Sequence, residues 1–170
     1  VDFNVPLSNK KVVTDNSRIV AAKKTIDKIL KDGGTPILMS HLGRPKGDDP
    51  EFSLAHIVKD VERVLGAKVK FTNEVLGEKT TAIVENSGPG EIVLLENLRF
   101  CPEEKNGDLK FAEELSKLGD SYVNDAFGTA HRAHASTSII ASFFPKNKFA
   151  GELLLKEVES IHKVMNTGKK

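Results

Sequence analysis

The sequence predicts an α/β domain, a three-layer, Rossmann-like arrangement in which helices flank a parallel sheet. Strand-like apolar runs alternate with amphipathic segments almost to the end of the chain, which is the pattern of βαβ units. The runs at 36–40 and 92–95 are short and almost continuously apolar, as expected of strands that are buried on both faces. With 170 residues and 39% apolar content, the chain is long enough for one domain with its own core.

The first half of the chain has the pattern strand, helix, strand, helix, strand. Each predicted helix has a polar capping residue before it and glycine after it, and its apolar residues recur on one face. The strands are predicted at 1–6, 36–40 and 68–71, and the helices are capped by Asp15 or Asn16 and by Ser53 and end at Gly33-Gly34 and Gly66.

The second half continues the alternation with a weaker beginning. Its clearest strand is the apolar run 92–95, which follows a Gly-Pro-Gly turn. The other expectations are a weak helix at 73–86, a loop at 97–106, a helix at 109–118, a strand ending at 122–123, a helix capped by Ser136 or Thr137 and a last helix at about 151–166.

Composition excludes several functional classes. A net charge of +1 gives no reason to expect a nucleic acid or a membrane as partner, and no apolar run approaches the ~20 residues that span a bilayer. The single cysteine, Cys101, suits a reducing, cytoplasmic location and is predicted to be a bystander in a loop. A phosphate-binding P-loop and a dinucleotide-binding glycine motif are both missing from the sequence, so a ligand must be bound mainly by side chains.

Arginines follow three of the predicted strands. Arg44, Arg99 and Arg132 each come shortly after a strand-like run, and in an open α/β sheet ligands bind beyond the carboxyl ends of the strands. A guanidinium binds phosphate or carboxylate with a planar, bidentate fork. Gly43 lets the backbone approach a ligand closely. The sequence therefore predicts a small anionic ligand.

Each of these signals also has a plainer interpretation. The segment 40–45 could be a solvated loop, and Arg99 could form an ion pair with Glu96 or Glu103. His131 and His134 could suggest a metal, but they supply only two ligands and Arg132 would repel a cation. We therefore expect His131 and Arg132 to bind an anion and predict no metal site.

Two features near the start of the chain suggest that the ligand also carries hydroxyl groups. Asp2 and Asn4 lie on the same side of the first predicted strand, where a carboxylate can accept a hydroxyl hydrogen bond, although a turn-forming Asp-Asn pair is equally compatible. Arg18 lies in the first turn of the following helix, the end that the helix dipole makes unfavourable for a cation. A residue placed against local preference hints at a function.

Taken together, these segments resemble the N-terminal, phosphoglycerate-binding domain of the phosphoglycerate kinase family. The resemblance runs through essentially the whole chain in the order and spacing of the family's motifs. It rests on VDFNVP at 1–6, SHLGRPKG at 40–47, LLENLRF at 94–100 and VNDAFGTAHRAHAST at 123–137.

The resemblance implies phosphoryl transfer between 1,3-bisphosphoglycerate and ADP, giving 3-phosphoglycerate and ATP in glycolysis. It assigns His41, Arg44, Arg99 and Arg132 to the phosphate that does not move, and Asp2 and Asn4 to the glycerate hydroxyl. Arg18 is the implied catalytic residue, facing the transferred phosphoryl group. The full set of substrate-binding residues that it implies is Asp2, Phe3, Asn4, Arg18, His41, Leu42, Gly43, Arg44, Arg99, His131 and Arg132.

The resemblance also sets expectations for domain organisation. We expect residues 1–150 to be the phosphoglycerate-binding domain with a truncated first strand, and 151–170 to begin an interdomain helix. We expect the C-terminal domain, which in the family binds Mg-ADP or Mg-ATP, to be absent, and we therefore expect this chain to bind no cofactor, to be inactive alone and to be a monomer. Its expected partners are the phosphoglycerates and the missing domain. The alternatives are a non-catalytic anion-binding module and a complete nucleotide-binding enzyme.

Overall fold

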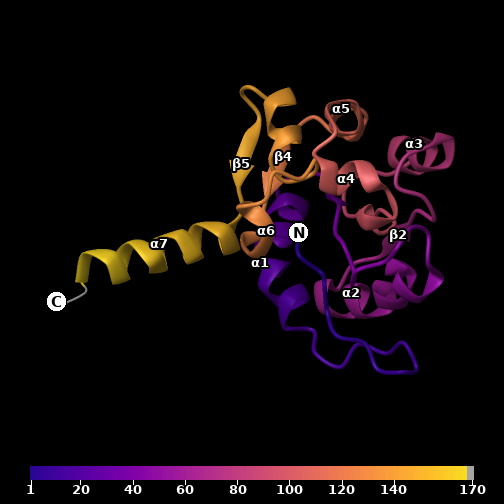
Figure 1. The fold of residues 1–170 in the computed structure, drawn as a ribbon, viewed down its shortest axis with the longest axis horizontal. Coiled ribbons are helices and arrows are strands. Elements are labelled where there is room, and N and C mark those ends of the chain that lie inside the picture. Colours follow the sequence, from indigo (N-terminus) through magenta and orange to yellow (C-terminus); the bar gives the residue numbers. More distant parts are fainter. Residues whose placement is uncertain (168–170) are drawn as a thin grey trace.

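A parallel three-stranded sheet forms the centre of the fold. The computed structural model describes residues 1–167. Its strands lie in the order β1 (Ile37–Leu38), β3 (Ile92–Leu94) and β2 (Val69–Phe71), and both pairs are parallel. Figure 1 shows the helices arranged around these strands. The predicted α/β class with a parallel sheet is confirmed.

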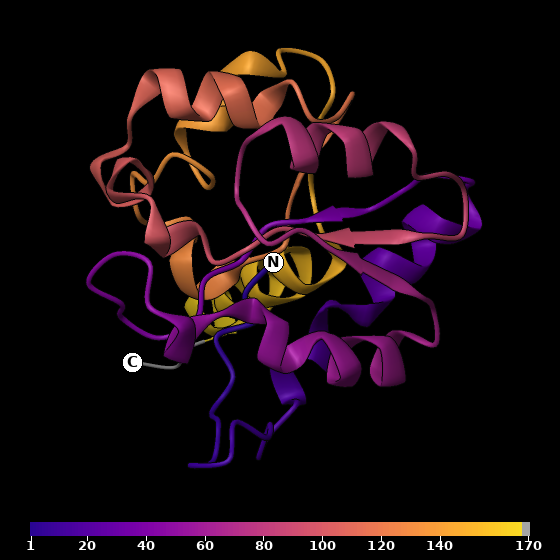
Figure 2. The same ribbon diagram turned by 90° about the vertical axis from the view of Figure 1, so that its right-hand side faces the viewer.

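The alternation of side chains along β3 creates two cores and hence three layers. Ile92 and Leu94 pack with α1 (Ser17–Lys31) and α2 (Val58–Leu65). Val93 and Leu95 point the other way, toward the second core, because successive strand residues face opposite sides. Figure 2 shows α1 and α2 on one side of the sheet and α3 (Glu78–Glu85) and α5 (Leu109–Ser116) on the other.

The helices that cover the second face are short. They are α3, α4 and α5, with 3₁₀ turns before and after them, and α5 packs on the last of these turns. The bounds of the elements not yet given are Pro50–Phe52, Leu54–Ile57, Leu98–Phe100 and Ile139–Phe143 for the 3₁₀ helices, and Pro102–Asn106 for α4, Phe127–Ala130 for α6 and Glu152–Thr167 for α7.

A second, two-stranded parallel sheet is separate from the first. It pairs β4 (Tyr122–Asn124) with β5 (Lys148–Ala150). A cavity of about 610 Å³ is lined by residues of both β1 and β4. The Val1 ammonium group lies at this cavity and donates to the Met39 carbonyl at 3.1 Å. Two strand edges therefore border the same space without pairing to each other.

Three sequence predictions of local structure are wrong. Residues 1–6 form no strand in the described part of the chain. The Phe3 amide donates to the Ser40 hydroxyl at 2.8 Å, and an isolated β-bridge just after this segment joins Leu7 to Val13. The segment 97–106 is not a plain loop but carries a 3₁₀ turn and α4. The helix after residue 136 is a 3₁₀ helix that begins after Ser138. Neither Ser136 nor Thr137 caps it, because their hydroxyls donate to Glu104 and to the Arg132 carbonyl instead.

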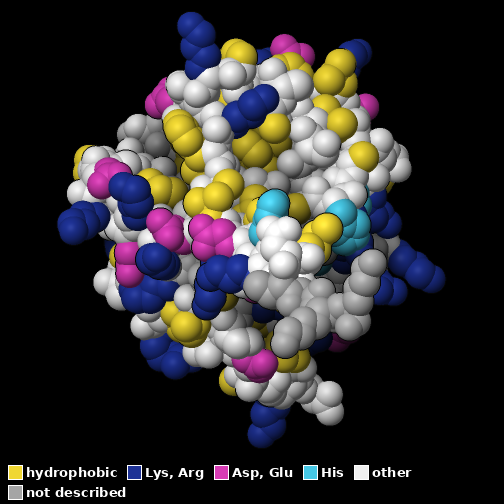
Figure 3. Space-filling model, turned by 90° about the vertical axis from the view of Figure 1, so that its left-hand side faces the viewer, with side chains coloured by type: hydrophobic (Ala, Val, Ile, Leu, Met, Phe, Trp, Pro, Cys, Tyr) yellow, Lys and Arg dark blue, Asp and Glu magenta, His cyan; other side chains and the backbone are white. Residues whose placement is uncertain are grey.

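The last helix, α7, projects from the body of the protein (Figure 1). Its beginning packs on α1 and α6, whereas Val164 and Met165 near its end are 70% and 77% exposed. Figure 3 shows hydrophobic side chains among the polar ones on the side from which α7 projects. Within residues 1–167, no helix is both long and apolar enough to span a bilayer.

Candidate functional site

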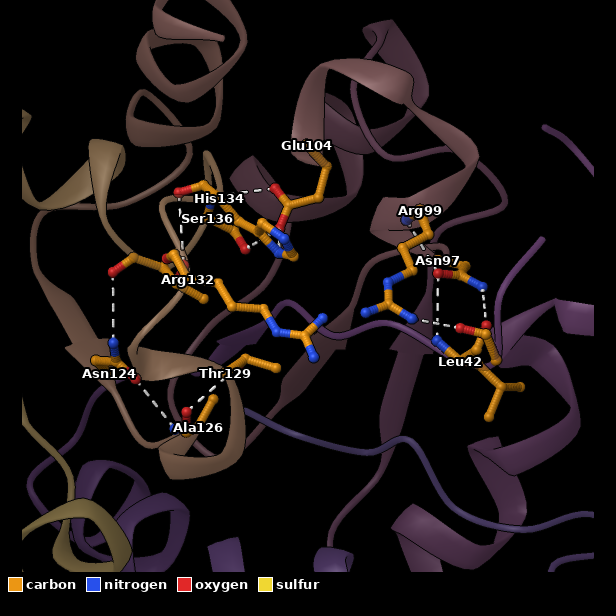
Figure 4. Close-up of polar contacts among 12 residues, drawn as sticks. Leu42, Asn97, Arg99, Glu104, Asn124, Ala126, Thr129, Arg132, His134 and Ser136 are labelled. Atoms are coloured by element: carbon orange, nitrogen blue, oxygen red, sulfur yellow. Dashed lines mark hydrogen bonds and ion pairs between the residues drawn. The ribbon is translucent and has the colours of Figure 1, made fainter. Parts of the chain in front are cut away.

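The predicted site residues gather where the chain leaves β1, β3 and β4. His41 and Gly43 follow β1, Arg99 follows β3, and Arg132 lies beyond β4 and α6. Figure 4 shows the Arg99 and Arg132 side chains extending toward each other from opposite sides of this space. Parallel strands place their carboxyl ends at one edge of the fold, which is why segments so distant in sequence meet here.

Asn97 organises two of these segments. Its side chain is fully buried, and its Oδ1 accepts hydrogen bonds from the Leu42 amide at 3.2 Å and the Arg99 amide at 3.0 Å. Its Nδ2 donates to the carbonyls of Leu42 and Phe52, both at 2.8 Å. One amide side chain therefore fixes the loop after β1 against the turn that carries Arg99.

Among the described residues, the Arg99 side chain is held by a backbone carbonyl and not by a carboxylate. Its Nη1 donates to the Gly43 carbonyl at 2.5 Å. Glu96, one of the two alternative partners considered from the sequence, instead accepts from the Ser53 hydroxyl at 2.6 Å and the Leu54 amide at 2.8 Å. The positive charge of Arg99 therefore remains available to a ligand.

The electrostatics of the site favour an anion. Burial, together with the nearby Arg132 and Arg44, lowers the pKa of Arg99. Burial and the Arg99 charge lower the pKa of His41 from 6.5 to about 4. Cations that depress one another's pKa are less stable without a counter-charge, so an anion bound among them would relieve this repulsion.

The segment after α6 carries two exposed members of the site. His131 and Arg132 are exposed, and the Thr137 hydroxyl donates to the Arg132 carbonyl at 2.8 Å. His134 is half-buried beside Glu104. No group of three or more potential metal ligands occurs within residues 1–167; that the site takes no metal stays a prediction.

The residues at the start of the chain meet the same loops. Asn4 accepts a hydrogen bond from the Gly43 amide at 2.8 Å through its Oδ1. Asp2 forms an ion pair with Arg18, so the cation in the first turn of α1 has a carboxylate partner. Asp2 also accepts from the Asn4 amide at 3.2 Å, the turn-like contact that was the alternative interpretation.

Three predicted residues contribute backbone or packing more than side-chain chemistry. Phe3 and Leu42 are buried in the first core. Gly43 has a φ of 61°, and a Cβ there would collide with the Phe52 ring, so only glycine fits this turn. Arg44, next to it, is exposed.

Sequence reasoning missed three buried polar residues that shape the site, namely Asn97, Glu104 and Ser136. A signal for Asn97 was present, since Glu96 and Asn97 directly follow a continuously apolar strand, where buried polar groups must find partners. Glu104 had no such signal, because it lies in a charged stretch that is typical of a solvated surface.

The fold and the site together define an α/β domain with a cluster of cationic side chains at the carboxyl ends of parallel strands. The family model described as phosphoglycerate kinase matches residues 1–170. The chain belongs to the phosphoglycerate kinase family and corresponds to its N-terminal region.

Individual relatives agree with this assignment. The chain is 50% identical over 166 residues to the phosphoglycerate kinase of Moorella thermoacetica, and 46% identical over 159 residues to the enzyme of Arabidopsis thaliana named "Phosphoglycerate kinase 3, cytosolic". The alignment with the Moorella protein includes 97% of this chain but only 42% of that protein. The alignment with the Arabidopsis protein includes 94% of this chain and 39% of that protein.

Solved structures give the same result. The phosphoglycerate kinase of Coxiella burnetii aligns with a TM-score of 0.81 at 34% identity, covering 96% of this chain and 40% of that one. The enzyme of Pyrococcus horikoshii OT3 aligns with a TM-score of 0.88 at 28% identity, covering 100% of this chain and 43% of that one. The chain therefore spans about two fifths of these relatives.

Proposed function

We propose that this chain is the substrate-binding half of a phosphoglycerate kinase and that its cationic cluster binds 3-phosphoglycerate or 1,3-bisphosphoglycerate. The observation that carries the proposal is the meeting of Arg99, Arg132 and His41 around one space without a carboxylate hydrogen-bonded to either guanidinium in the described residues. Guanidinium groups match the geometry of phosphate oxygens. In this proposal they hold the phosphate that is not transferred, with Arg44 and His131 closing over it.

The other end of the ligand is assigned to the residues at the start of the chain. Asp2 and Asn4 lie beside the loop after β1 and offer oxygens to the glycerate hydroxyl. The backbone of Phe3, Leu42 and Gly43 gives these groups a fixed support. This arrangement would orient the ligand with its carboxyl end toward Arg18.

Arg18 has an electrostatic role in the proposed reaction. In phosphoryl transfer, negative charge lies on the equatorial oxygens of the moving group, and fixed cations stabilise it. No general base is needed, because the attacking carboxylate or phosphate oxygen is already anionic. When the ligand binds, Arg18 would exchange its partner Asp2 for the phosphoryl oxygens.

The magnesium nucleotide belongs, in this proposal, to a C-terminal domain beyond residues 1–150. Residues 1–167 offer no group of three metal ligands, so we assign no step to a metal on this chain. The segment from 151 would be the interdomain helix, which fits the exposed apolar residues on α7. A monomeric whole protein would then bind both substrates across the two domains.

The cavity between β1 and β4 supports the proposal that the first strand is truncated. Within residues 1–167, neither strand has a neighbouring strand on the side that faces the cavity, and buried strand edges are normally paired. Asp125 lines the same cavity, and its Oδ2 is buried without a hydrogen-bond partner in the described residues. Residues joined to the Val1 nitrogen would enter this space.

Alanine substitution tests the binding role. Arg44→Ala and Arg99→Ala should each weaken 3-phosphoglycerate binding by about 1.5–3 kcal/mol, the range for hydrogen bonds to charged groups. Arg63→Ala is the matched control, because Arg63 lies on α2 and pairs with Asp60. Isothermal titration calorimetry gives the affinities. Equal affinities in all three variants would refute the assigned site.

An activity measurement tests the division of labour. The chain alone should form no ATP from 1,3-bisphosphoglycerate and ADP, since the proposal places the nucleotide elsewhere. Coupled-assay detection of ATP at a rate above the uncatalysed background would show that the chain is a complete enzyme.

A further inference from the structure

One buried carboxylate joins the two arginine-bearing segments of the site. Glu104 lies in α4 and is 3% exposed. Its Oε2 accepts from the Ser136 amide at 3.0 Å, and its Oε1 accepts from the Ser136 hydroxyl at 2.6 Å. Its carbonyl accepts from the Ala135 amide at 2.9 Å. Figure 4 shows Glu104 reaching from α4 to the segment that contains Arg132 and His134.

Glu104 is also fixed relative to Arg99. The Cys101 amide donates to the Leu98 carbonyl at 3.1 Å, and the Glu104 amide donates to the Cys101 carbonyl at 3.1 Å, so α4 continues from the 3₁₀ turn that carries Arg99. At the other end of α4, a Cβ on Gly107 would lie 2.5 Å from the Ala133 carbonyl oxygen. Helix α4 is therefore joined to the Arg99 turn at its beginning and lies close to the 131–136 segment at its end.

The charge of Glu104 matters as well as its hydrogen bonds. His134 Nδ1 lies 3.8 Å from Oε1, and Arg99 and the Val1 ammonium are the other positive groups that act on this carboxyl. Burial raises the pKa of Glu104, and burial with the nearby arginines lowers the pKa of His134. His131 and Lys105 also lower the pKa of His134, and Glu104 is the carboxylate that forms an ion-pair contact with its ring.

We propose that Glu104 is a positioning residue, which holds the segment 131–136 opposite Arg99 and provides the counter-charge for His134. The proposal rests on the proposed function for its ligand, the phosphate of phosphoglycerate. It assigns no contact with that ligand to Glu104. A carboxylate that accepts from both the amide and the hydroxyl of one residue sets position more strictly than a single contact does.

Two variants separate the hydrogen bonds from the charge. Glu104→Ala removes both side-chain contacts to Ser136, whereas Glu104→Gln keeps a side chain of the same shape and removes the charge. Ser136→Ala removes only the hydroxyl contact to Glu104 and replaces Glu104→Ala in these measurements if Glu104→Ala does not fold. Glu103→Gln is the matched control, since Glu103 is its exposed neighbour on α4. Leu115→Ala, in the second core, controls for lost stability.

The first measurements need no ligand. Amide hydrogen exchange should show faster exchange at Ala135 and Ser136 in Glu104→Ala or Ser136→Ala, beyond any change in Leu115→Ala. In Glu104→Gln, NMR titration should give a lower pKa for His134 than in the unchanged protein, because its counter-charge is gone. The inference would be overturned if amide exchange were unchanged in both Glu104→Ala and Ser136→Ala. It would also be overturned if the pKa of His134 were unchanged in Glu104→Gln.

The ligand measurement links the inference to the site. Glu104→Ala should weaken 3-phosphoglycerate binding by about tenfold, the effect of losing one hydrogen bond to a charged group, while Glu103→Gln and Leu115→Ala bind as the unchanged protein does. Equal affinity in Glu104→Ala would overturn the positioning role. If the unchanged chain binds no 3-phosphoglycerate, the proposed function fails, and the ligand-free measurements still decide the role of Glu104.

Discussion

At the scale of single residues, buried polar side chains arrange the exposed charged ones. Asn97 and Glu104 are both nearly inaccessible and each connects two segments that are far apart in the sequence. The arginines themselves make few internal contacts. Their positions therefore depend on neighbours whose own hydrogen bonds are complete, as is usual for buried polar groups.

Replacing Asn97 should destabilise the protein strongly. Asn97→Ala removes four hydrogen bonds and leaves buried backbone groups without partners, so we expect the free energy of unfolding to fall by about 3 kcal/mol. Urea denaturation measures the change. Asn73→Ala, at an exposed loop position, is the control, and a similarly small effect in both variants would contradict the role of Asn97.

His41 should make stability depend on pH. Its pKa is lowered from 6.5 to about 4 in the folded protein, so the unfolded chain binds the proton first as the pH falls. Stability should therefore decrease from about pH 6.5 to about pH 4. The contribution of His41 is the difference between the free energies of unfolding of the unchanged protein and of His41→Gln, measured at each pH. His162→Gln, on the exposed part of α7, is the control and should keep the pH dependence of the unchanged protein. Loss of this pH dependence in His162→Gln and not in His41→Gln would contradict the assignment.

At the scale of elements, local chemistry predicted most helices and their ends. Ser53 accepts from the Ala55 amide at 3.1 Å, and Gly66 ends α2 in a left-handed conformation, both as the sequence indicates. The capping of the helix after residue 136 was predicted wrongly because Ser136 bonds to Glu104, a tertiary contact that local pattern does not contain. The prediction of a strand at 1–6 was wrong because a strand also needs the edge of a neighbouring strand with which to pair.

Two glycines with similar backbone angles offer a controlled comparison. Gly66 and Gly43 have φ values of 69° and 61°, but a Cβ meets nothing within 4 Å at Gly66 and the Phe52 ring at Gly43. Gly66→Ala should cost about 1 kcal/mol from backbone strain alone. Gly43→Ala should cost clearly more and disturb the loop after β1. Denaturation midpoints that fall equally would show that the Phe52 contact is unimportant.

At the scale of the whole molecule, the fold class and the convergence of the site were predictable because parallel strands have one carboxyl edge. The separation into two sheets was not, since neither apolar runs nor motifs state which strands pair. The cavity between β1 and β4, the unpaired Asp125 oxygen and the projecting α7 all mark surfaces that lack a partner within residues 1–167.

Extending the chain before Val1 tests the first of these surfaces. An added strand of about six alternating apolar residues, long enough to follow β1, should pair with both edges and raise the free energy of unfolding. The amides of Met39 and Val123 should then exchange more slowly. A Gly-Ser extension of the same length is the control, and equal stability of the two extended chains would argue against a strand in the cavity.

The most direct test of the proposed function is a titration with 3-phosphoglycerate and, separately, with ATP, followed by backbone amide shifts. We predict that 3-phosphoglycerate shifts the amides of the segments 41–44, 97–99 and 131–136, and that ATP shifts none of them. Binding of ATP without binding of 3-phosphoglycerate would contradict the account.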